Sequence, residues 1–312
     1  MAFATATRPA NPAPEDSAES ISYPSKAELL SALPAELSKL SPAKSWASLA
    51  MSAGLSLLAV GLGPLLPLSA AATPLWLLYG VITGTIAMGC WVIAHECGHH
   101  AFHPNRRIEG VVGFVLHSIL LVPYYSWAHS HAVHHAHCNH LEQGETHVPP
   151  RATSPMGRTT EQLKQRLNPT VFGIISLFNH LVIGWQLYLF LGATGGEDYD
   201  SPTSHFWNRK HNLNGKRRLF PHSFGKWMLR SNLGLLAMVA LLIIASVQFS
   251  LLRVLCLYGL PYLVINMWLT TYTWLQHTNT DIPHFSNETW TWSKGALQTA
   301  VSYTHLTLPT KA

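Results

Sequence analysis

The chain has 312 residues, of which 48% are hydrophobic and only 11% are charged. Soluble globular domains carry about 25% charged residues, so this composition excludes an ordinary soluble enzyme and predicts a single membrane-embedded unit. The formal charge of +5 does not indicate nucleic-acid binding, because the basic residues are scattered at the ends of apolar segments and no recognition motif accompanies them.

Residues 1–45 form an N-terminal segment that is rich in Ala, Pro, Ser and Glu. Its first part is predicted to be disordered, because it contains too few apolar residues to form a core. No basic region precedes an apolar core there, so no secretory signal is visible. From Ser25 a short amphipathic helix, broken near Pro34, is expected to lie on the membrane. We expect this whole segment to be cytosolic.

Four segments have the length and apolar character of membrane spans, because about 20 residues cross a hydrocarbon core ~30 Å thick. Lys39 and Lys44 precede the first span, while Arg106 and Arg107 follow the second. By the positive-inside rule both ends of this first hairpin face the cytosol. The sequence therefore predicts an all-α integral membrane protein with two transmembrane hairpins and a cytosolic cap. The four spans are residues 46–66, 75–94, 233–252 and 254–275.

Two further apolar segments are interpreted as re-entrant or interfacial helices. Residues 111–125 are only about 15 residues long, and a crossing there would put the two histidine clusters described below on opposite sides of the membrane. A crossing by residues 171–191 would place the basic run between Arg209 and Arg230 in the lumen. Both segments are therefore expected to stay on the cytosolic side.

Twelve of the 19 histidines lie between His95 and His147. His95 and His99 are four residues apart, so on a helix they share one face. His131, His134 and His135 repeat this logic with spacings of three and four residues. Imidazole is a common ligand of transition metals, and five such groups exceed the three or four protein ligands of one zinc ion. The pattern predicts a site for two metals.

The histidines outside these two clusters receive separate interpretations. His277 follows the last predicted span and returns to the same membrane side as the clusters. His100 and His129 are undecided between a metal-site role and the surface. Eight further histidines are interpreted as surface residues that extend towards water; they are His103, His117, His137, His140, His180, His205, His211 and His222.

Asn266 is a polar residue within the last predicted span. Polar groups inside the membrane mark functional sites by default. An alternative is that Asn266 satisfies backbone groups that are freed near Pro261.

A zinc protease is the main competing interpretation of the first cluster. The residues His95-Glu96-Cys97-Gly98-His99 satisfy the H-E-x-x-H pattern, in which the glutamate activates a metal-bound water. The second cluster and the lack of one clear third ligand argue against it. If it were correct, the protein would bind zinc and Glu96→Gln would abolish peptide cleavage.

An ordered series of motifs resembles the membrane fatty-acid desaturases, most closely the delta-12 (oleate) acyl-lipid type of the endoplasmic reticulum. The resemblance covers roughly residues 25–299. Its motifs are HECGHHAF at 95–102, SHAVHH at 130–135, LEQGETHVP at 141–149, GWQLYL at 184–189, SHF at 204–206 and LQHT at 275–278.

This resemblance implies a di-iron centre that uses dioxygen and two electrons to introduce a cis double bond into a monounsaturated acyl chain. It implies a phospholipid-bound oleoyl substrate, cytochrome b5 as a separate electron donor, and a multi-pass location in the endoplasmic-reticulum membrane with cytosolic histidine boxes. The implied iron ligands are His95, His99, His131, His134, His135 and His277, with Glu96, Asn266 and His100 as supporting residues behind them.

Two branches of the same family stay open as alternatives, the fatty-acid hydroxylases and the omega-3 desaturases, because they share these boxes. The form HECGH favours the delta-12 branch. The family's third box, HxxHH, is expected after WSKGALQT, but residues 301–312 read VSYTHLTLPTKA and have no family counterpart. We expect residues 46–300 to be an incomplete desaturase domain, residues 301–312 to be a non-native tail, and the chain as written to bind iron poorly and to be inactive.

Overall fold

The computed structural model describes residues 23–208, 216–278 and 282–299. In this part of the chain the regular elements are all helices, which confirms the predicted all-α class. The expected disorder near the N-terminus and the expected tail at 301–312 lie outside the described residues.

Four long helices account for most of the apolar sequence. They are α2 (Pro42–Leu62), α3 (Thr73–Gly98), α9 (Gly225–Phe249) and α11 (Leu260–His277). The shorter helices are α1 (Lys26–Ala32), α4 (Arg106–Ile119), α5 (Tyr124–Ala136), α6 (Pro155–Arg166), α7 (Pro169–Phe178), α8 (Gly184–Leu191), α10 (Leu251–Val254) and α12 (Trp292–Leu297). Single π-helical turns join α7 to α8 at Asn179–Ile183 and α10 to α11 at Leu255–Gly259.

The described residues contain five helical segments that are long and apolar enough to cross a membrane. Four of them coincide with the expected spans, and the outward faces of α2 and α9 are apolar, as at Leu57 (73% exposed) and Val247 (79% exposed). Such exposed apolar surface is stable only in lipid or against a partner. These features identify a membrane protein.

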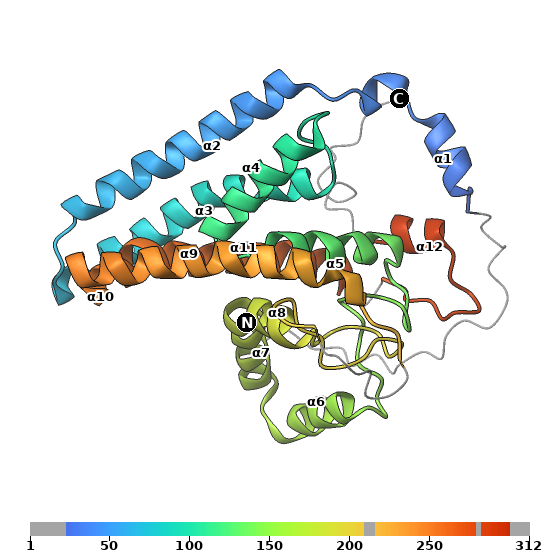
Figure 1. Ribbon diagram of the computed structural model, residues 1–312. Coiled ribbons are helices and arrows are strands. Elements are labelled where there is room, and N and C mark those ends of the chain that lie inside the picture. Colours follow the sequence, from blue (N-terminus) through green and yellow to red (C-terminus); the bar gives the residue numbers. More distant parts are fainter. Residues whose placement is uncertain (1–22, 209–215, 279–281, 300–312) are drawn as a thin grey trace, which may run out of the picture.

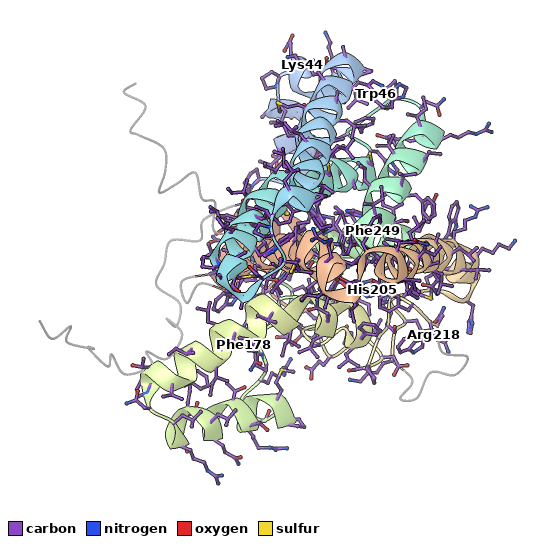
Figure 2. All side chains as sticks on the ribbon, turned by 90° about the vertical axis from the view of Figure 1, so that its left-hand side faces the viewer. Lys44, Trp46, Phe178, His205, Arg218 and Phe249 are labelled. Atoms are coloured by element: carbon purple, nitrogen blue, oxygen red, sulfur yellow. The ribbon has the colours of Figure 1, made fainter. Side chains whose placement is uncertain are left out.

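The fifth segment, Pro169–Leu191, contains α7 and α8. Figure 1 shows α7 below the long helices and running across their direction. In Figure 2 α6 and α7 project away from the other helices, with Phe178 on the outside. This orientation agrees with an interfacial segment, and that assignment stays a prediction. Helices α4 and α5 are bent by 106° at a short break, so residues 111–125 form a corner and not one straight helix.

Helix α3 lies at the centre of the arrangement, with α2, α4 and α11 packed against it. The crossing with α11 is close because Gly84 faces that helix. A Cβ atom at Gly84 would lie 2.7 Å from the carbonyl oxygen of Pro261 and 2.7 Å from Cβ of Val264. The absence of a side chain therefore allows the two backbones to approach. This crossing fixes how the C-terminal end of α11, with His277, sits relative to α3.

The turn after α3 is held by a buried carboxylate. Glu109 on α4 is 1% exposed, and its two oxygens accept hydrogen bonds from Phe102 N (3.1 Å), His103 N (3.0 Å) and Arg106 Nη1 (3.1 Å). His100 has a left-handed backbone (φ 63°), and its Nδ1 lies 3.2 Å from the same carboxylate. Helix α3 is thus terminated just after the first histidine pair, and the chain is turned into α4.

Gly84→Ala tests the close crossing. The added methyl group meets backbone and a β-branched side chain that cannot retract, so we expect a loss of about 1–3 kcal/mol in stability and a lower unfolding temperature in detergent. Gly54→Ala on α2 is the matched control, since its added Cβ meets nothing within 4 Å. It should leave the unfolding temperature unchanged or raise it, because alanine favours a helix by up to about 1 kcal/mol over glycine. Equal changes of the unfolding temperature in the two variants would contradict the close contact between Gly84 and α11.

Candidate metal centre

Four histidines from two helices meet with their Nε2 atoms. His95 lies in the last turn of α3 and His99 is its C-cap residue, whereas His131 and His135 lie one turn apart on α5. The Nε2···Nε2 distances are 3.1 Å for His95 and His99, 3.0 Å for His99 and His131, 2.9 Å for His131 and His95, and 3.1 Å for His135 and His131. The structure therefore brings these four predicted residues together.

These contacts cannot all be hydrogen bonds. A ring nitrogen of neutral histidine either donates or accepts, and a hydrogen bond needs one atom of each kind. Around the closed triangle of His95, His99 and His131, two of the three nitrogens must be of the same kind. A cation shared by the lone pairs removes this conflict. Metal–imidazole bonds of about 2.1 Å at right angles would separate the nitrogens by about 3.0 Å, which is the spacing observed.

A second group of potential ligands lies beside the first. His134 Nε2 is 3.3 Å from His277 Nε2, and the Cys138 sulfur is 3.9 Å from His134 Nε2. All three residues are buried. The His131 and His134 rings stack with centroids 6.0 Å apart, so the two groups are neighbours. Together they fit a pair of metal ions. Cys138 was not predicted from the sequence, because a lone cysteine has no distinguishing pattern.

The residues behind the first group keep its rings in place. Glu96 Oε1 lies 3.0 Å from His95 Nδ1, so that ring donates from Nδ1 and leaves Nε2 with a lone pair for a metal. Trp127 stacks on the His131 ring with centroids 4.6 Å apart, and Trp91 stacks on His95 at 5.8 Å. The structure thus puts Glu96 where the sequence predicted it, whereas the role of both tryptophans was not predicted.

The electrostatics favour uncharged imidazoles, the form that binds metals. Burial and the neighbouring His95 and His135 rings lower the pKa of His99 to about 4. His99 is therefore neutral near pH 7, and its nitrogen is available without the loss of a proton.

Two predicted supporting residues lie away from the histidine groups. Asn266 is on α11, eleven residues before His277, so it lies about 16 Å away along the helix axis. Its Nδ2 is 3.3 Å from the amide oxygen of Gln186 when that amide donates to the carbonyl oxygen of Val182. His100 faces Glu109 instead of the metal ligands. Both residues have structural contacts that explain them.

The interpretation of the remaining histidines as surface residues is wrong for three of them. His117 and His205 are 0% exposed and His140 is 3% exposed. His205 lies within a buried hydrogen-bond array described below, and His117 packs edge-on against Trp127 with ring centroids 4.8 Å apart. His211 lies outside the described residues. Burial of these residues comes from contacts between distant segments, which residue spacing does not reveal.

A cavity of about 860 Å³ adjoins both groups of ligands. Histidines line one part of its wall, and large apolar side chains line another. The apolar part belongs to the core formed by α3, α8 and α11. Its size and apolar lining suit a flexible hydrocarbon ligand. The residues that line the cavity include Trp91, Trp185, Tyr188, Leu269, His134 and Glu145.

Comparison with known proteins agrees with this geometry. The family model described as fatty acid desaturase matches residues 71–306. The chain is 38% identical to the omega-6 fatty acid desaturase, endoplasmic reticulum isozyme 1, of Glycine max, over 72% of this chain and 54% of that protein. It is 36% identical to the delta(12)-fatty-acid desaturase of Arabidopsis thaliana, over 72% of this chain and 55% of that protein.

A fungal relative gives the same result. The delta(12) fatty acid desaturase of Mortierella alpina is 36% identical over 72% of this chain and 57% of that protein. The chain spans about half the length of the curated relatives it matches. The family uses iron and dioxygen in general, and the two groups of imidazoles fit such metals. By the extent of the family match and by these identities, the chain belongs to the fatty acid desaturase family.

Proposed function

We propose that the chain forms part of the active site of a delta-12 acyl-lipid desaturase, which introduces a cis double bond into a monounsaturated C18 chain esterified in phospholipid. The observation that carries this proposal is the pair of adjoining imidazole groups on the wall of an apolar cavity, at the ends of candidate membrane helices. A protein that binds a lipid chain next to two redox metals has the parts that oxidation of an unactivated hydrocarbon needs.

The proposed centre holds two iron ions. His95, His99, His131 and His135 would hold one, and His134 with His277 would contribute to the other. Burial raises the pKa of the Cys138 thiol to about 11, so this sulfur keeps its proton near pH 7 and is the weaker ligand of its group. When bound, the iron ions would supply the activation of dioxygen for C–H bond cleavage, with two electrons from an external donor and two from the acyl chain.

The protein residues orient and protect this chemistry. Glu96 fixes the proton of His95 on Nδ1, and stacking with Trp127 fixes the plane of the His131 ring. Trp91, Trp185 and Leu269 are buried and apolar, so they exclude water from the part of the cavity that would take the acyl chain. The same side chains restrict where along its length the chain meets the metals.

The relatives support the finer parts of the proposal. Their names state delta-12 or omega-6 desaturation, and one name states the endoplasmic reticulum, so we propose that membrane for this protein. Lys39, Lys44, Arg106 and Arg107 support a cytosolic position of the histidine groups. The family resemblance supports cytochrome b5 as the electron donor.

The zinc-protease alternative receives less support from the geometry. In an H-E-x-x-H protease the glutamate faces the metal-bound water, whereas Glu96 contacts Nδ1 of His95, the nitrogen that points away from the other imidazoles. The hydroxylase and omega-3 alternatives use the same site, and the product separates them from delta-12 desaturation.

His131→Ala tests the metal site. His131 Nε2 contacts three other imidazoles, so its removal should weaken iron binding strongly. The loss should exceed the roughly 10–100-fold that follows when a residue hydrogen-bonded to a metal ligand is removed. Iron per chain measures this, after dialysis of protein purified from the full coding sequence, read from the transcript to its own stop codon. His222→Ala is the matched control, because His222 is exposed and away from both groups. Equal iron content in both variants and the wild type would refute the ligand assignment.

Glu96→Gln tests the role of the carboxylate. If Glu96 only holds the His95 tautomer, iron affinity should fall by about 10–100-fold and no peptide cleavage should appear in any variant. Unchanged metal affinity together with loss of a peptidase activity that the wild type possesses would instead establish the zinc-protease alternative.

Lipid analysis tests the reaction. The full coding sequence, read from the transcript to its own stop codon, is expressed in yeast that makes oleate but no diene. We expect a delta-9,12 C18 diene in the phospholipids, and its loss in the His131→Ala variant. A hydroxy fatty acid as the product would identify a hydroxylase in place of a desaturase. An iron-loaded protein that forms neither product would refute the proposed function.

A further inference from the structure

Glu145 is a buried acid on the wall of the cavity. Its side chain is 4% exposed, and neither carboxyl oxygen has a hydrogen-bond partner of ordinary geometry. The loop that carries it is packed tightly, since a Cβ atom at Gly195 would lie 3.0 Å from the Glu145 carbonyl oxygen. An unpaired ionised carboxylate in such a position costs several kcal/mol. A neutral carboxylic acid does not carry this cost.

A buried hydrogen-bond array lies beside Glu145. His205 Nδ1 lies 3.1 Å from the carbonyl oxygen of Leu189, so Nδ1 carries the proton and donates. Burial lowers the pKa of His205 to about 4, so the ring is neutral. Ser130 Oγ donates to the carbonyl oxygen of Trp127 at 3.0 Å, and it lies 2.9 Å from His205 Nε2 and 2.8 Å from Tyr188 Oη. These three side chains therefore bring no charge to the array.

Tyr188 is the neighbour of Glu145 in this array, and it brings no charge to the carboxyl group. Its hydrogen bond lowers the pKa of Glu145, but burial raises that pKa by more. Tyr199 is the other titratable group that interacts with Glu145, and it is neutral as well. Burial raises the pKa of Glu145 to about 8.

The proposed reaction needs protons as well as electrons. For each double bond, one CH₂–CH₂ unit, one O₂, two electrons and two protons give one CH=CH unit and two waters. The electrons come from a one-electron haem donor, and the protons must reach oxygen inside a cavity whose inner lining is largely apolar. Of the two acids that line the cavity, Glu96 is already paired with His95. Glu145 is the one that has a proton to give.

We propose that Glu145 is the proton donor of the cavity: its carboxylic O–H transfers a proton to an oxygen atom of dioxygen as that oxygen is reduced to water. The O–H bond of Glu145 breaks, an O–H bond of water forms, and the carboxylate recovers a proton from solvent at the cavity rim, where Thr194 and Pro150 are exposed. Burial of Glu145 beside an array that carries no charge keeps the acid protonated between turnovers. This role rests on the proposed function.

Infrared spectroscopy of the iron-free protein tests the protonation state without any catalysis. Wild-type protein at pH 7 should show a carboxylic-acid C=O band that disappears with a midpoint near pH 8 and is missing in Glu145→Gln. Glu161→Gln is the matched control, because Glu161 is an exposed acid on α6 that contacts only Gln165; it should keep the band. A wild type without the band at pH 7, or a Glu145→Gln variant that retains it, would overturn the proposal.

Turnover of the iron-loaded full-length protein tests the proton transfer. Glu145→Gln should keep its iron and its fold but lose about 10²-fold or more in product formation, with oxygen consumed without product. Glu145→Asp, which keeps the acid, should recover part of the loss, and Glu161→Gln should match the wild type. Full activity of Glu145→Gln would overturn the role of Glu145 alone. A wild type that binds iron but makes no product would overturn the proposed function and this role with it, while the infrared result would stand.

Discussion

The structure depends on contacts between imidazole nitrogens that cannot all be hydrogen bonds. His95, His99 and His131 form a triangle of Nε2 atoms at 2.9–3.1 Å, and such a triangle always contains one contact between like groups. Without a cation the contact is repulsive, so the end of α3 and the C-terminal half of α5 are pushed apart. With a cation the same contact becomes an attraction. Metal binding and the packing of these two helices are therefore one equilibrium.

The membrane imposes a second constraint on the same helices. Helix α3 has to present apolar side chains over most of its length and then place two ligands at its last turn. The glycine at the crossing with α11 brings the backbones together deep in the apolar region, while the buried carboxylate of Glu109 ends the helix beyond His99. The close contact at Gly84 sets the distance between α3 and α11. The hydrogen bonds to Glu109 turn the chain after α3, so that His99 stays close to His95 and His131.

Much of this site could be predicted from the sequence because its geometry is local. Spacings of four residues place His95 with His99 and His131 with His135 on shared helical faces, and the structure brings both pairs together. The division of the second cluster was not foreseen. At 100° per residue, His134 and His135 lie on opposite sides of His131, so His134 turns towards His277 and the other two turn towards α3.

What could not be predicted depends on contacts between distant segments. Asn266 lies on nearly the same face of α11 as His277, but three turns away, and polarity alone did not reveal that distance. Glu145 and His205 lie in two of the family-like motifs, but their burial was not predicted, because it comes from the approach of α5, α8 and the loop after α8. Local spacing predicts which side chains share a face, whereas it does not predict which loop covers that face.

The position of His277 also sets when the site can form during biosynthesis. The partner of His134 in the second group is His277, which lies 143 residues later in the chain. At roughly 5–20 residues per second, the ribosome synthesises this stretch in about 7–30 s. During that interval the first hairpin is already in the bilayer, and its imidazoles face water without the helix that completes the second group. Iron that arrives early finds every assigned ligand except His277, so the second group is completed only after membrane insertion of α11. Because α11 is synthesised after the other ligand-bearing helices, it is the helix that completes the second metal group.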